Sequence, residues 1–208
     1  PSVRRADSDA LSRKVSPPKR APPATAAAVV PWLPTDMLAC GARLAAALDS
    51  LEFMVSLDIY RNETTRHADV ILPGLSALED SHYDIAFPQF SFRNHARFSA
   101  PVFEPTLPPE WQTLLRLAAI AKGSGARADV LALDDEMVAD EVHKLAGDNA
   151  PQVLQALGSR KGPERLLDLA LRSGPYGDLF GAKPEGLNLD KVQAASAAGR
   201  GIDLGPLQ

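Results

Sequence analysis

One stretch decides the fold of this chain: Phe53-Met54-Val55-Ser56-Leu57-Asp58, which Asp69-Val70-Ile71-Leu72 echoes a few residues later. The first is almost continuously apolar, as is typical of a strand buried on both faces of a parallel sheet, and the second predicts another short strand. Between them, Asn62 is placed to cap a short helix that has the acidic Glu63 in its first turn. Pro73-Gly74 stops the second run. Strand, short helix, strand predicts the α/β class with a doubly wound parallel sheet.

Further predictions follow on either side of this stretch. Residues 42–50 have their leucines and alanines on one face and predict a short amphipathic helix. Residues 90–98 alternate in part, which favours an extended segment. From Pro109 onward, apolar stripes at helical spacing predict four helices, with stops at Gly123, Gly147, Gly158 and Gly174. We therefore divide the chain into a sheet region at 42–105, a helical region at 106–174 and an irregular tail at 175–208.

Residues 1–41 differ from the rest in composition. They hold seven prolines and a cluster of arginines and lysines, and no apolar period runs through them. Such a stretch buries too little apolar surface to offset the entropy of ordering, so we expect a disordered leader. A solvated leader and a basic tail that binds an acidic partner are both compatible with this pattern.

Composition excludes several classes of function. The net charge of −4 gives no broad basic surface for nucleic acid. Cys40 is the only cysteine, which excludes an internal disulfide framework and an iron–sulfur cluster held by this chain alone. No apolar run reaches the roughly 20 residues that span a bilayer, and no secretory signal is present, so we expect a cytoplasmic protein. The four histidines lack metal-ligand spacing. We predict no catalytic residue and no metal ligand.

Asp58 is the residue most suited to binding. It stands at the carboxyl end of the first predicted strand, where open α/β sheets bind their ligands. A carboxylate there can accept the two parallel hydrogen bonds that guanine offers from its ring N–H and its exocyclic amine, a donor pair that adenine lacks. The same position also suits an aspartate that only caps a turn, and the residues alone leave both interpretations open.

Residues 54–73 as a whole, MVSLDIYRNETTRHADVILP, resemble a signature of the DMSO-reductase superfamily of molybdenum or tungsten enzymes. That signature has a hydrophobic strand, an Asp, an aromatic residue, a Glu-Thr-Ala-like helix and an Ala-Asp-Val-Val-Leu-Pro segment. The likeness is close over roughly residues 42–105 and weak beyond. It implies a partial Rossmann-like region that binds molybdopterin guanine dinucleotide, with Asp58 on guanine, Leu57 offering backbone contact, and Glu63 and Thr64 beginning a helix beside the nucleotide.

The resemblance also implies what this chain lacks. The cysteine cluster of the iron–sulfur-binding members is absent, and neither the metal-ligating segment nor the barrel-like domain that closes over the pterins is recognisable. We therefore expect a fragment of a molybdopterin-dependent oxidoreductase that is inactive alone and works with the remaining domains or subunits. The parent enzyme would carry out redox transfer on a small substrate such as formate or nitrate. The alternative is a non-catalytic remnant of a truncated gene, or a helical interaction module.

Overall fold

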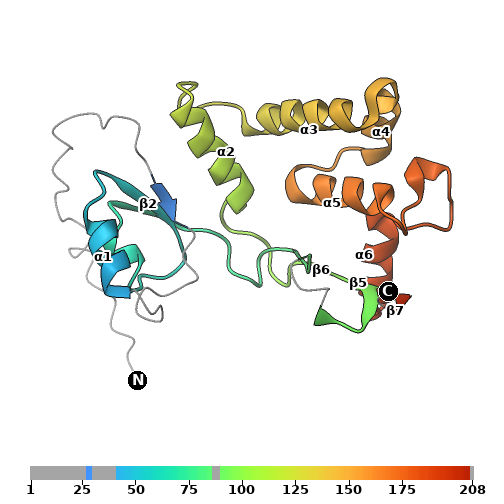
Figure 1. The fold of residues 1–208 in the computed structure, drawn as a ribbon, viewed down its shortest axis with the longest axis horizontal. Helices are drawn as coiled ribbons and strands as arrows, with labels where there is room; N and C mark the ends of the chain where they lie inside the picture. The colour runs from blue at the N-terminus through green and yellow to red at the C-terminus, as the bar shows by residue number, and fades with distance from the viewer. Residues whose placement is uncertain (1–26, 30–40, 86–89, 207–208) are drawn as a thin grey trace.

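A computed structural model describes residues 27–29, 41–85 and 90–206 of the chain. It has mixed α/β structure, with a small sheet and helix α1 (Gly41–Asp49) at one end and a group of helices at the other (Figure 1). Helix α2 (Glu110–Ala121) and two extended segments lie between them. The α/β class predicted from the sequence is therefore confirmed.

The sheet has three parallel strands in the order β1-β2-β3. Strand β2 (Met54–Leu57) lies in the centre, and all four of its residues are buried, as its continuous apolar sequence predicted. Strand β3 (Val70–Leu72) pairs with it in a register that places Val55 opposite Val70. Asp69 links the two strands just before the pairing begins: its Oδ2 accepts a hydrogen bond from the Met54 N–H at 2.8 Å.

Most of the predicted disordered leader lies outside the described residues. Within it, however, β1 (Ala27–Val29) is a strand that pairs with β2, so the prediction that ordered structure begins near Gly41 is wrong for these three residues. The reason is the pairing with a neighbouring strand. That strand offers backbone hydrogen bonds, so a short apolar run with no visible period becomes ordered. The helix predicted at 42–50 is confirmed as α1.

The rest of the region at 42–105 does not extend the parallel sheet. Strand β4 (His82–Tyr83) pairs antiparallel with β6 (Phe98–Ser99), and β5 (Arg93–Ala96) pairs antiparallel with β7 (Ile202–Pro206). The extended segment predicted at 90–98 is thus confirmed in part. Its two strands pair with different partners in two separate ladders.

The helical region is confirmed. It contains α2, α3 (Val130–Ala146), α4 (Ala150–Leu157) and α5 (Gly162–Ser173), with a short 3₁₀ turn at Gly147–Asn149. A further 3₁₀ turn, Leu179–Gly181, lies beyond this region. The C-caps of α3, α4 and α5 are the predicted glycines, and the C-cap of α2 is Lys122, one residue before the predicted Gly123. Six residues from α3, α4 and α5 form the core: Val138, Val142, Ala150, Val153, Leu157 and Leu169.

The prediction of an irregular tail at 175–208 is wrong. Helix α6 (Leu189–Ala197) begins at Asn188, whose side chain accepts a hydrogen bond from the Lys191 N–H, and strand β7 follows. Leu189 and Val192 are fully buried in a second core cluster with Ala96 and Phe98. A helix of nine residues shows little period, and β7 exists only through its pairing with β5, so local sequence did not indicate either element.

Candidate functional site

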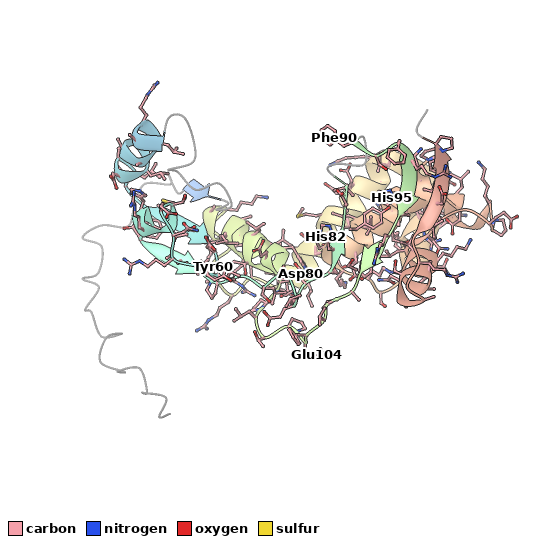
Figure 2. The ribbon with its side chains drawn as sticks, turned by 90° about the horizontal axis from the view of Figure 1, so that it is seen from below. Tyr60, Asp80, His82, Phe90, His95 and Glu104 are labelled. Atoms are coloured by element: carbon pink, nitrogen blue, oxygen red, sulfur yellow. The ribbon has the colours of Figure 1, made fainter. Side chains whose placement is uncertain are left out.

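The loop that follows β2 carries the predicted site. Asp58 comes directly after the strand, and its N–H continues the ladder by donating to the Leu72 carbonyl oxygen at 3.1 Å. Its side chain is half-buried, whereas Ile59 and Tyr60 beyond it are exposed. Tyr60 lies on the side of the sheet that faces the middle of the molecule (Figure 2). The sequence therefore placed Asp58 correctly at the carboxyl end of the central strand.

Both oxygens of the Asp58 carboxylate already have local partners. Oδ1 accepts a hydrogen bond from the Tyr60 N–H at 2.9 Å, and Oδ2 accepts one from Asn62 Nδ2 at 2.6 Å. The turn-capping role that the sequence left open is thus observed. A carboxylate oxygen has two lone-pair sites, so each oxygen keeps one acceptor position beyond these bonds.

Asn62 organises the turn between the two strands. Its Oδ1 accepts hydrogen bonds from the N–H groups of Thr64 and Thr65, both at 3.0 Å. Its own N–H donates to Thr65 Oγ1 at 2.8 Å, and that hydroxyl donates to the Tyr60 carbonyl oxygen. Asn62 thus closes the turn with its side chain, but the N-cap residue of the short helix that follows is Thr64, so the prediction of Asn62 as the helix N-cap is wrong.

The helix itself is shorter than predicted. It is one 3₁₀ turn, Thr65–His67, so Glu63 and Thr64 precede it instead of beginning it. The Thr64 N–H donates a hydrogen bond to Asn62 Oδ1. The apolar strand β3 follows so closely that a longer helix has no room. The prediction that Glu63 and Thr64 begin a helix is therefore wrong.

The strand beneath Asp58 is closely packed. Leu57 is buried, and Ser56 is completely buried with no hydrogen-bond partner for its Oγ among the residues that the structure describes. Ser56 and Asp58 share one face of the strand because side chains alternate along it. The Ser56 hydroxyl is an unsatisfied polar group directly below the candidate site, but its burial keeps it from any ligand on the surface of this loop.

A hydrogen-bond contact between two side chains holds the far side of the loop. His67 Nδ1 lies 2.6 Å from Asp49 Oδ1, which joins the 3₁₀ turn to the end of α1. The His67 side chain is buried, whereas that of Asp49 is exposed. The loop from Asp58 to His67 is therefore held at both ends, by the sheet and by α1.

The hollows on the connecting segments offer a different chemistry. One of about 410 Å³ is lined by four carboxylates, Glu79, Asp80, Glu110 and Glu164, together with Trp111. Among the described lining residues, Lys161 is the one cation, and its Nζ donates a hydrogen bond to Asp135. Asp80 lies on one connecting segment and Glu104 on the other (Figure 2). Because the lining is acidic, it repels phosphate, and the nucleotide site does not belong there.

Glu79 has a structural role in this region. Its Oε1 accepts a hydrogen bond from Thr106 Oγ1 at 2.7 Å, and its Oε2 accepts from Ser76 Oγ at 2.8 Å and from the Ser76 N–H. These bonds favour the ionised form and lower the pKa of Glu79 to about 2. Glu79 thereby ties the two connecting segments together.

Sequence reasoning missed a buried charge network on α5. Asp168 is completely buried and accepts hydrogen bonds from Arg160, from Arg172 and from the Leu189 N–H. Arg172 also donates a hydrogen bond to Asp178, and Arg165 forms an ion pair with Asp134 on α3. One signal was present: residues 165, 168 and 172 fall on the same helical face as Leu169, so the buried stripe of α5 is itself charged.

Among the described residues, no group of three or more His, Cys, Asp or Glu side chains is arranged to hold a metal ion. None of the helices in the described ranges is long and apolar enough to cross a membrane. No protein-family model, curated protein or solved structure matches this chain.

Proposed function

We propose that this chain forms part of the guanine site for molybdopterin guanine dinucleotide in a larger oxidoreductase. The observation that carries the proposal is the carboxylate of Asp58, which is half-buried at the carboxyl end of the central strand and has one local hydrogen bond on each oxygen. By its chemistry, each carboxylate oxygen can accept one further hydrogen bond. The residues of this loop and its likeness to the DMSO-reductase signature support a guanine site here. The acidic hollow is a less suitable place for it.

The loop has the chemistry that a guanine nucleotide requires. The two remaining acceptor positions of Asp58 are on adjacent oxygens, as a bidentate contact with the guanine N–H pair needs. Arg61 and Arg66 are exposed in the same loop and are suited to a diphosphate. Leu57 is proposed to contribute backbone contact and Glu63 to stand beside the nucleotide, whereas Thr64 is buried and is proposed only to support the turn.

The bound cofactor would supply the redox chemistry, on a small substrate of the formate or nitrate kind. The residues of this chain would bind the guanine end and orient it, and they would provide no metal ligand, no iron–sulfur cluster and no catalytic group. The three parallel strands are proposed to be part of a Rossmann-like sheet that the remaining domains or subunits complete. We propose a cytoplasmic location for the assembly.

The test is a titration of the full chain with GDP and with ADP, followed by chemical shifts of the backbone amides of residues 57–65. We expect GDP to bind at least about tenfold more tightly than ADP, because only guanine offers two donors to Asp58. Asp58→Asn should remove most of this preference, since it replaces one acceptor with a donor.

Glu52→Gln is the matched control. Glu52 is an exposed carboxylate just before β2, at the opposite end of that strand from Asp58, and its loss should leave both affinities unchanged. Thermal unfolding of each variant separates loss of binding from loss of the turn. Equal affinity for the two nucleotides in the wild type, or an unchanged preference in Asp58→Asn, would contradict the proposal.

One observation favours a second candidate function, a protein-interaction module. Three apolar side chains near β5 in the sequence are strongly exposed: Phe92 at 87%, Phe90 at 79% and Ile85 at 76%. Phe90 lies on the surface close to His95 of β5 (Figure 2). Exposed apolar residues often mark interaction sites. Sedimentation of wild type and Phe92→Ser would test it, since a self-associating chain should become monomeric in the variant.

A further inference from the structure

We infer that Asn62 is a positioning residue that sets the guanine preference of Asp58. The inference rests on the proposed function, and it concerns a residue that would not itself touch the nucleotide. Its basis is the hydrogen bond at 2.6 Å from Asn62 Nδ2 to Asp58 Oδ2, which joins two side chains four residues apart across the turn.

Asn62 is itself held in one orientation. Its Oδ1 accepts from two backbone N–H groups, those of Thr64 and Thr65, and this fixes which end of the amide points at Asp58. The amide nitrogen therefore faces the carboxylate, and the carboxylate is gripped between this donor and the Tyr60 N–H.

Holding the Asp58 carboxylate by these two hydrogen bonds has two consequences for binding. The carboxylate loses its freedom to rotate before a ligand arrives, so less conformational entropy is lost on binding. One acceptor position on each oxygen is occupied from the protein side, which leaves the other two as a fixed pair. A fixed pair discriminates between guanine, with two adjacent donors, and adenine, which lacks them.

Asn62→Asp separates the two functions of this side chain. The new carboxylate can still accept from the Thr64 and Thr65 N–H groups, but it places an oxygen against Asp58 Oδ2 where a donor stood. We expect the ratio of ADP to GDP dissociation constants to fall about tenfold. The thermal midpoint should fall less than in Asn62→Ala, which loses the turn as well.

Asn62→Ser provides an independent route if Asn62→Asp folds poorly. A serine hydroxyl can accept from the same N–H groups, as serine does at helix N-caps, but it is too short to reach Asp58. The guanine preference should fall by a similar factor without any added charge.

Thr65→Val is the matched control. It removes the hydroxyl that bonds to the Asn62 N–H and the Tyr60 carbonyl oxygen, and it leaves both partners of Asp58 in place. We expect a lower thermal midpoint with the GDP preference kept within about twofold. The two kinds of variant should thus separate stability from selectivity.

The outcomes are distinguishable. If wild type shows no GDP preference that depends on Asp58, the proposed function fails, and the inference fails with it. If Asp58→Asn abolishes the preference but Asn62→Asp and Asn62→Ser retain it, only the inference is overturned. The inference is also overturned if Thr65→Val loses as much of the GDP preference as Asn62→Asp does. General loosening of the turn would then explain the loss in both variants.

Discussion

Glu79 shows how one carboxylate can make the protein sensitive to acid. Four hydrogen bonds from Ser76 and Thr106 lower its pKa from 4.5 to about 2, so it stays ionised in the folded chain at pH values where it protonates in the unfolded chain. The contribution of Glu79 to stability is therefore complete above about pH 4.5 and is lost as the pH falls toward 2.

We predict that Glu79→Gln destabilises the chain at neutral pH and that the difference from wild type shrinks between about pH 4.5 and pH 2. Urea unfolding across this interval measures it. Asp80→Asn is the control, because Asp80 is exposed and, within the described part of the chain, its side chain accepts a hydrogen bond only from the neighbouring Ser81 N–H. A constant difference between Glu79→Gln and wild type over the whole interval would refute the prediction.

At the level of single residues, the sequence could place Asp58 at the end of a strand but could not predict the hydrogen bonds around it. Asp58 was identifiable because a polar residue after an apolar run marks a strand end. The contact between Asn62 and Asp58 crosses an irregular turn, and no spacing rule predicts it. The bond from Glu79 to Thr106 spans 27 residues and depends on how the connecting segments lie.

Helix α5 packs through charge as well as through apolar contact. Asp168 has three donors at its two oxygens and no exposure to solvent. Removing one partner from a buried ion pair leaves an uncompensated charge, which is far more costly than losing an exposed pair.

We therefore predict that Asp168→Asn lowers the free energy of unfolding by about 3–5 kcal/mol. Denaturation by urea, followed by helical circular dichroism, measures it. Asp190→Asn is the control: it also pairs with Arg160, but its side chain is 68% exposed, so its loss should cost about 1 kcal/mol or less. Similar losses for the two variants would show that burial of Asp168 does not determine its contribution.

Among elements, those defined by local pattern were predictable and those defined by pairing were not. Strands β2 and β3 and helices α1, α2, α4 and α5 follow from apolar runs and from glycine or proline at their ends. The start of α3 at Val130 was missed, because its first turns mix acidic and apolar residues. Strands β1 and β7 need partners far along the chain, so their own residues carried no signal.

At the scale of the whole molecule, β1 forms one edge of the parallel sheet. Val55 and Ser56, buried in β2, pair with Ala28 and Val29 of that strand. We predict that a chain lacking residues 1–29 exchanges its β2 amide hydrogens faster than a chain lacking only residues 1–26, because the strand that protects them is gone. Equal exchange in the two truncated chains would show that β1 adds no protection.

The pairing of β5 with β7 has a consequence for the order in which the chain folds. Arg93 and Asp203, whose side chains bond across this pair, are 110 residues apart. At roughly 5–20 residues per second, a ribosome needs about 5–22 s to make the partner after it has made β5. During that interval β5 has an open edge beside the exposed Phe92, and the growing chain is exposed to aggregation until synthesis reaches β7.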